Sequence, residues 1–108
     1  MQKKNKILIV DDEAIIRDSL RDWLTDAGYE VLTAGNGVEG LELVRKEKPG
    51  VAVIDLVLPG SDGLDLLRKA KQIQPGIQVI IITAYSSVHT AIAAIREGAY
   101  DYIEKPFS

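Results

Sequence analysis

The feature of this chain that most constrains its fold is a short apolar run that contains one carboxylate. The run extends from Val51 to Leu58, contains Asp55, and is bounded on each side by a Pro-Gly pair. Apolar residues between such breakers are typical of a strand buried on both faces of a sheet. A buried carboxylate is unfavourable unless something compensates it. Ligands of open α/β sheets bind at the carboxyl ends of strands, where Asp55 is expected, so Asp55 is the first candidate for a functional residue.

Other apolar segments predict further strands, and segments with a helical period separate them. Strands are expected at 7–10, 29–33, 51–55, 77–83 and 100–103, and helices at 16–27, 38–47, 64–73 and 88–95. This alternation, with short connections, predicts an α/β fold with a doubly wound, five-stranded parallel sheet and helices on both faces. Because crossovers between parallel strands are right-handed, we expect the common strand order 2-1-3-4-5.

The helices are expected to pack through their apolar faces. Trp23 has core spacing in the first helix, so we interpret it as a packing residue and not as part of a ligand site. The fourth helix is expected to be capped by Ser86 and Ser87, and its predicted inward residues are Val88, Ala91, Ile92 and Ile95. His89, the single histidine, lies near the start of that helix, away from the predicted strand ends, and no catalytic role is expected for it.

Length, composition and charge limit the class of protein to which the chain can belong. A length of 108 residues predicts one domain, 1–108. The net charge of -3 argues against direct nucleic-acid binding by this domain. The absence of cysteine fits a reducing cytoplasm. The apolar run after the basic N-terminus, Ile7 to Val10, is too short for a signal peptide or a membrane span, so a cytoplasmic location is expected.

Carboxylates follow two strands that the predicted order makes neighbours. Asp11 and Asp12 end the first strand, and Asp55 ends the third. Three converging carboxylates repel one another unless a cation neutralises them. Hard oxygen ligands with open positions suit Mg²⁺. The alternative is that these residues only cap helices or turns, as Asp12 could at the first helix, but capping gives no reason for Asp55 after a buried strand.

A hydroxyl and an ammonium are expected at the same edge of the sheet. Thr83 ends the fourth strand, and Lys105 follows the fifth. Beside a metal-carboxylate site, these two groups suit recognition of a tetrahedral anion such as a phosphoryl group. Each is a weak signal alone, and their shared position at strand ends carries the prediction.

These motifs resemble the receiver domain of two-component response regulators, which has a flavodoxin-like fold. The matching features are Asp11-Asp12, Asp55, the loop Pro59–Gly63, Thr83-Ala84, Tyr102 and Lys105-Pro106. They occur in the family's order over essentially the whole chain. The segment from Thr83 to Phe107 is most similar to receivers of the nitrogen-regulation (sigma-54 activator) class, which usually precede an AAA+ ATPase and a DNA-binding domain.

The resemblance implies a role for each of these residues. Asp55 would be the phosphoacceptor for the phosphohistidine of a sensor histidine kinase. Asp12, Asp55 and the backbone carbonyl of Val57 would bind Mg²⁺, with Asp11 acting partly through water. Thr83 and Lys105 would bind the phosphoryl oxygens, and the Lys105–Pro106 peptide bond would be cis.

The resemblance also implies a switch. Phosphorylation adds charge and acceptor oxygens at Asp55. Thr83 and Tyr102 would respond, and the surface of the fourth helix and fifth strand would change to control an output domain, with transcription as the expected output. Tyr85 follows Thr83 and is expected to modulate access to the site. A homodimer through the region of the fourth helix and fifth strand is a family expectation.

Receivers normally end in a fifth helix, which this chain lacks. One helix would then have to cover a whole face of the sheet. We expect open apolar surface near Leu20 and Trp23 and on the inner faces of the first, third, fourth and fifth strands. The hypothesis is that the chain is a truncated piece of a longer regulator, or that a partner covers this face.

Three alternatives compete with a signalling switch that is not a turnover enzyme. A Mg²⁺-dependent phosphohydrolase with an Asp nucleophile would need a second carboxylate two residues later, where this chain has Val57. A flavodoxin-like cofactor binder would need a first loop that cradles phosphate, whereas this loop carries Asp11, Asp12 and Glu13. A degenerate receiver that binds partners without phosphorylation would not need the full residue set.

Overall fold

The structure is a computed structural model that describes residues 5–85 and 87–106. Its elements in chain order are β1 (Lys6–Val10), α1 (Ala14–Asp26), β2 (Glu30–Ala34), α2 (Gly37–Glu47), β3 (Val51–Asp55), β4 (Val57–Leu58), β5 (Ser61–Asp62), α3 (Gly63–Ile73), β6 (Gln78–Thr83), α4 (Val88–Arg96) and β7 (Asp101–Glu104). None of the helices in this part of the chain is long and apolar enough to cross a membrane.

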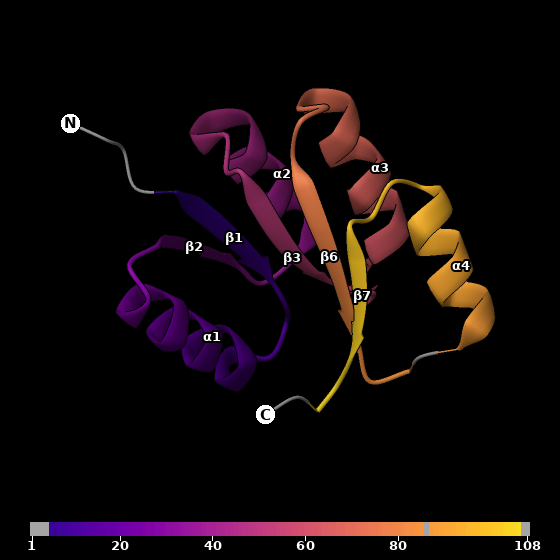
Figure 1. Cartoon of the computed structure of the whole chain (residues 1–108), viewed down its shortest axis with the longest axis horizontal. Helices are drawn as coiled ribbons and strands as arrows, with labels where there is room; N and C mark the ends of the chain where they lie inside the picture. The colour runs from indigo at the N-terminus through magenta and orange to yellow at the C-terminus, as the bar shows by residue number, and fades with distance from the viewer. Residues whose placement is uncertain (1–4, 86, 107–108) are drawn as a thin grey trace.

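Five strands form one sheet in the order β2-β1-β3-β6-β7, and every neighbouring pair is parallel. This is the predicted order 2-1-3-4-5, because β6 and β7 are the fourth and fifth strands of the sheet. The predicted doubly wound α/β fold is therefore confirmed. In Figure 1, α1 lies on the opposite side of the sheet from α2 and α3.

One face of the sheet carries the main core. Alternate residues of four strands pack with side chains from α2, α3 and α4, which matches the period of two expected of strands. The buried members include Leu8, Val10, Ala52, Ile54, Val79 and Ile81 from the strands and Val44, Leu66, Leu67, Ala70 and Ala94 from the helices. This rigid layer fixes the strand ends relative to one another.

The other face is only partly covered, as predicted. An apolar groove of about 310 Å³ is lined by Leu20, Trp23 and Leu24 of α1 and by Val53, Ile80, Ile82 and Ile103 of the sheet. The expectation that β1 contributes to the opening is wrong, because α1 packs over β1 and Ile7 and Ile9 are buried. Trp23 is 64% exposed at the rim of the groove, so it is not packed into the core as its helical spacing indicated, but it does lie at the open apolar surface predicted near Leu20 and Trp23.

Helix α4 packs differently from its predicted face. Its buried residue is Ala94, whereas the exposed residues include Val88, Ile92 and Ile95. The helix therefore rests on the sheet through small side chains and turns a larger apolar stripe outward. Ser87 caps α4 by accepting a hydrogen bond from the Thr90 N–H, as predicted, while Ser86 lies outside the described residues.

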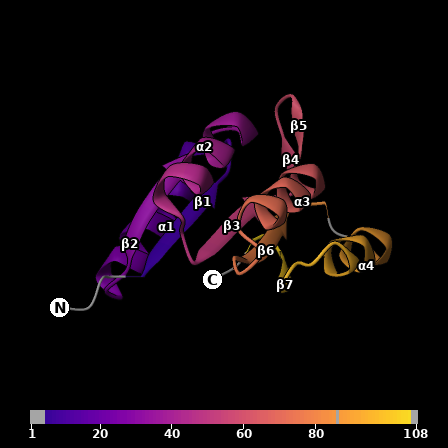
Figure 2. The ribbon, with the colours of Figure 1, turned by 90° about the horizontal axis from the view of Figure 1, so that it is seen from above.

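The loop after β3 contains an unpredicted hairpin. Strands β4 and β5 pair antiparallel, and Figure 2 shows them projecting beside α3. Gly63 follows directly and accounts for the close approach of α3 to the end of β3. A Cβ at Gly63 would lie 2.5 Å from the Asp55 backbone oxygen and 2.6 Å from Leu56 Cα, so only glycine fits there without a shift of backbone.

Candidate functional site

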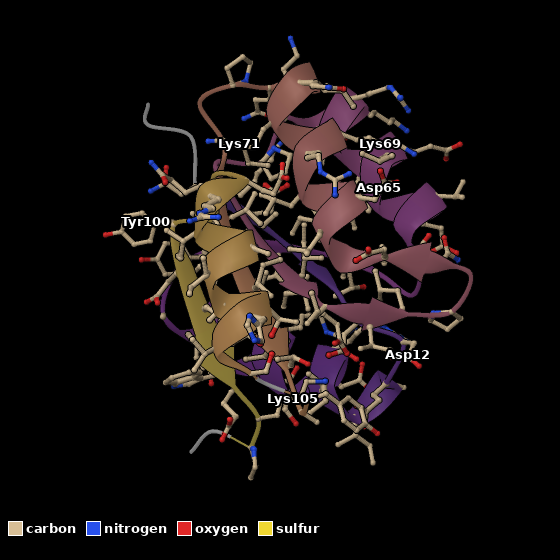
Figure 3. All side chains as sticks on the ribbon, turned by 90° about the vertical axis from the view of Figure 1, so that its right-hand side faces the viewer. Asp12, Asp65, Lys69, Lys71, Tyr100 and Lys105 are labelled. Carbon is tan, nitrogen blue, oxygen red and sulfur yellow. The ribbon has the colours of Figure 1, made fainter. Side chains whose placement is uncertain are left out.

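The register of the sheet brings the predicted site residues to one edge. Val10 pairs with Ile54, so Asp11 and Asp55 are neighbours just beyond the end of β1 and at the end of β3. At the other side, Thr83 pairs with Glu104, and the Lys105 N–H donates to the Thr83 carbonyl at 2.7 Å. The polar residues converge because parallel strands end at the same edge. Figure 3 shows Asp12 and Lys105 at this end of the molecule, opposite Lys71.

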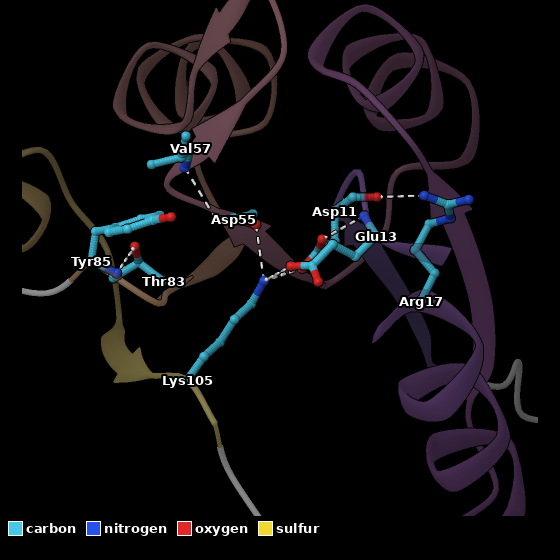
Figure 4. Close-up of polar contacts among 8 residues, drawn as sticks. All are labelled: Asp11, Glu13, Arg17, Asp55, Val57, Thr83, Tyr85 and Lys105. Carbon is cyan, nitrogen blue, oxygen red and sulfur yellow. Dashed lines mark hydrogen bonds and ion pairs between the residues drawn. The ribbon is translucent and has the colours of Figure 1, made fainter. Parts of the chain in front are cut away.

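Lys105 joins three carboxylates at the centre of the site. Its Nζ lies 2.8 Å from Asp11 Oδ2, 3.0 Å from Asp55 Oδ2 and 3.1 Å from Glu13 Oε1 (Figure 4). Asp11 and Asp55 are both buried. The peptide bond from Lys105 to Pro106 is cis, as the family resemblance implied. The ammonium therefore acts as the internal counter-charge of the cluster.

The electrostatics of this cluster shift two pKa values. Burial raises the pKa of the Asp55 carboxyl above its ordinary value, and the Asp11 charge acts in the same direction against hydrogen bonds from the Val57 N–H and Lys105. Burial alone would lower the pKa of the Lys105 ammonium, but contacts with Asp11, Asp55 and Glu13 outweigh it and raise that pKa. Asp55 is thus a carboxylate whose ionised form needs a nearby positive charge.

The same carboxylates have the geometry to share a cation. Asp11, Asp12, Glu13 and Asp55 each offer an oxygen, and these atoms all lie within 4.8 Å of one another. Asp11 Oδ2 is buried and, although ion-paired with Lys105, has no hydrogen bond among the described residues. A buried carboxylate oxygen that contacts only the Lys105 ammonium in the described part of the chain, and that lies beside other carboxylates, fits a hard divalent cation. Glu13 joins the three predicted acids, and its position directly after Asp12 was the available signal.

An open cleft gives access to these groups. Its volume is about 420 Å³, and its lining comprises Asp12, Glu13, Asp55, Val57, Ala84, Tyr85 and Lys105. Tyr85 is 75% exposed at the edge of the cleft, which fits the predicted role in access. The Val57 N–H donates to Asp55 Oδ1 at 3.1 Å and orients the carboxylate toward the cleft.

Thr83 is close to the cleft but is held differently from the other predicted residues. Its side chain is buried, and Oγ1 accepts a hydrogen bond from the Tyr85 N–H at 3.0 Å. It is not among the residues that line the cleft. Because Thr83 Oγ1 is the acceptor in that bond, its hydroxyl can still donate to a phosphoryl oxygen that reaches it, and such a contact stays a prediction.

Tyr102 is linked to α4 through a hydroxyl pair. Its OH lies 2.8 Å from Thr90 Oγ1, and Thr90 also belongs to the capping box of α4. Tyr102 is half-buried against the core, whereas Tyr100 is 69% exposed and projects from the surface (Figure 3). Tyr100 and Tyr102 share a strand face in the sequence pattern, but in the structure only Tyr102 packs against the core. His89 is exposed on α4 and is not one of the residues that meet at the cleft.

Comparisons with known proteins agree with this geometry. The sequence matches the response regulator receiver domain family over residues 7–108. It is 43% identical to a probable transcriptional regulator, ycf27, of Porphyra purpurea over 98% of this chain and 43% of that protein. The chain thus spans less than half the length of this curated relative.

Two solved structures extend the agreement. A CheY-like receiver domain protein from Methanospirillum hungatei JF-1 has a TM-score of 0.94 and 38% identity, covering 98% of this chain and 85% of that one. NtrX from Brucella abortus, solved with ADP, has a TM-score of 0.90 and 40% identity, covering 98% of this chain and 24% of that one. The fold, the buried aspartate cluster and the family match lead to one conclusion: the chain belongs to the response regulator receiver domain family.

Proposed function

We propose that this receiver domain is a phosphoacceptor switch in which Asp55 takes a phosphoryl group from the phosphohistidine of a sensor histidine kinase. The observation that carries the proposal is the Asp55 carboxylate at the open cleft, with the Lys105 ammonium 3.0 Å from its Oδ2 and three further carboxylates beside it. An Asp55 oxygen would attack phosphorus in line, forming an O–P bond as the P–N bond to the kinase histidine breaks. The electron pair of that bond leaves with the imidazole.

Mg²⁺ is the proposed cofactor. Asp12, Asp55 and the Val57 backbone carbonyl would hold it, with Asp11 acting partly through water. The convergence of the Asp11, Asp12 and Asp55 oxygens supports the carboxylate part of this assignment. When bound, Mg²⁺ supplies positive charge that neutralises the phosphoryl oxygens during transfer. Lys105 would then exchange carboxylate contacts for a phosphoryl oxygen, and the Thr83 hydroxyl would provide a second contact.

The proposed output is a change at the surface of α4 and β7. A phosphoryl group that draws Thr83 away from Tyr85 would alter the segment leading to α4, and Tyr102 is tied to that helix through Thr90. In the whole protein this surface would control an output domain, and the transcriptional relative supports a role in transcription. Likeness to NtrX is compatible with an ATPase output of the nitrogen-regulation class. A homodimer and a cytoplasmic location belong to the same proposal.

A turnover phosphohydrolase fits the site less well. Val57, two residues after the proposed nucleophile, offers no carboxylate to act as general acid. The domain would promote its own phosphorylation and dephosphorylation, but it would not turn over successive molecules of a separate substrate. This is the behaviour of a signalling switch.

The test is phosphorylation by a small donor. The protein is incubated with Mg²⁺ and acetyl phosphate, and its intact mass is measured for the wild type, Asp55→Ala and the control Asp65→Ala, which alters an exposed carboxylate on α3. One acid-labile phosphoryl group is expected on the wild type and on Asp65→Ala, and none on Asp55→Ala. Labelling of Asp55→Ala would overturn the assignment. Sustained turnover of a phosphomonoester would favour the hydrolase.

A further inference from the structure

Arg17 of α1 reaches back to the turn that carries the first two aspartates. Its Nη1 donates a hydrogen bond to the Asp11 backbone carbonyl at 2.7 Å (Figure 4). The side chain is half-buried. A Cβ built at Gly35 would lie 3.5 Å from the same Nη1, so the guanidinium lies against the loop between β2 and α2. Arg17 therefore joins three segments: β1, α1 and the loop after β2.

Each polar group of Asp11 makes a hydrogen bond or an ion pair, and the partners come from different elements of the fold. Its N–H donates to the Ala34 carbonyl at 3.1 Å, and its Oδ1 accepts from the Glu13 N–H at 2.9 Å. Its Oδ2 pairs with Lys105, and its carbonyl accepts from Arg17. The carbonyl lies where β1 has ended, so a side chain supplies the hydrogen bond that the strand ladder no longer provides. Loss of this donor would leave the backbone of a fully buried residue less constrained.

The positive charge of Arg17 should weaken cation binding at the proposed site, whereas its hydrogen bond to the Asp11 carbonyl should strengthen that binding. A guanidinium beside acidic ligands repels a divalent cation. The hydrogen bond fixes the turn from which Asp11, Asp12 and Glu13 direct their carboxylates toward Asp55. These two effects on cation affinity have opposite signs. Replacing Arg17 should therefore weaken binding if the hydrogen bond dominates and tighten it if the charge dominates.

We propose that Arg17 is a positioning residue of the cation site, which sets the turn after β1 so that its carboxylates converge with Asp55. The inference rests on the proposed divalent-cation site. Groups that orient metal ligands typically contribute 10–100-fold to metal affinity. Because Arg17 acts on the backbone of Asp11 and not on its carboxylate, the lower end is expected, about tenfold.

The experiment measures Mn²⁺ affinity, with Mn²⁺ as a paramagnetic probe of the Mg²⁺ site, from the amplitude of the free-ion electron paramagnetic resonance signal. Arg17→Met removes the donors and keeps the alkyl stem, and about tenfold weaker binding is expected. Arg17→Lys keeps the charge and one donor group, and its affinity should be intermediate. Arg21→Met is the matched control, since Arg21 lies one turn further along α1 and pairs with the exposed Asp18. Removal of its charge should leave the affinity unchanged or slightly tighter.

The outcomes separate this inference from the site on which it rests. Equal or tighter Mn²⁺ binding by a folded Arg17→Met protein overturns the role of Arg17. The effect of Arg17 on the affinity would then come from its charge and not from its hydrogen bond. If circular dichroism shows that Arg17→Met is unfolded, Arg17→Gln, which removes the charge and shortens the side chain so that it cannot keep the guanidinium contact with the Asp11 carbonyl, takes its place, and equal or tighter Mn²⁺ binding by that variant overturns the role. A wild-type protein that does not bind Mn²⁺ overturns the cation site itself and the inference with it.

Discussion

Lys105→Met is the substitution whose consequences the structure defines most sharply. The Lys105 side chain is 8% exposed, and its Nζ lies within about 3 Å of the fully buried Asp11 and the nearly buried Asp55. Removing one partner of a buried ion pair typically costs about 3–5 kcal/mol, because the remaining charge is left uncompensated. A carboxylate can escape part of this penalty by taking up a proton. We therefore expect the free energy of unfolding at neutral pH to fall by about 3 kcal/mol without divalent cation.

A divalent cation should reverse much of this loss. A ligand at a hundred times its dissociation constant stabilises a protein by about 2.7 kcal/mol. The variant lacks the ammonium that competes for the same oxygens, so at a fixed Mg²⁺ concentration it should gain more stability than the wild type. Urea denaturation followed by circular dichroism, with and without Mg²⁺, measures both quantities.

The matched control is Lys6→Met. Lys6 Nζ lies 3.1 Å from Glu47 Oε1, but both side chains are roughly a third exposed, at 30% and 27%. Such a pair contributes at most about 1 kcal/mol, and its removal should not change the response to Mg²⁺. An equal loss in the two variants, or an equal gain from Mg²⁺ in Lys105→Met and the wild type, would refute the view that Lys105 is the counter-charge of the cluster.

Three further predictions follow from the site and its surroundings. Gly63→Ala should lower the free energy of unfolding by about 3 kcal/mol because its Cβ would meet backbone, whereas Gly50→Ala, which faces open space, should change it by less than about 0.5 kcal/mol in the same urea titration. The raised pKa of Asp55 means that, without cation, ionisation destabilises the fold above that pKa and protonation relieves it below. The stability advantage expected for Asp55→Asn at neutral pH should therefore shrink on acidification, and a growing advantage would contradict this sign. Tyr102→Phe removes the hydroxyl contact with Thr90 and should lower stability by about 1 kcal/mol in thermal unfolding while leaving Mn²⁺ affinity unchanged.

The strands were predictable because central parallel strands read as short apolar runs between breakers. The site followed from them, since Asp11, Asp55, Thr83 and Lys105 each end or follow a strand and parallel strands end at one edge. The packing of the helices was less predictable. Periodicity identified an apolar stripe on α4, but it does not tell whether another element covers that stripe. Val88, Ile92 and Ile95 are in fact exposed.

The sequence by itself determined the fold class, the strand order and the set of acidic, hydroxyl and ammonium groups at one edge, because these depend on local periodicity and on chain order. The tertiary structure decided which groups touch. It added Glu13 to the cluster, turned the Thr83 hydroxyl toward Tyr85 and placed Arg17 on the Asp11 carbonyl. It also left Trp23 at the rim of an apolar groove. Such contacts depend on the packing of elements distant in sequence, and no local pattern encodes the distances between them.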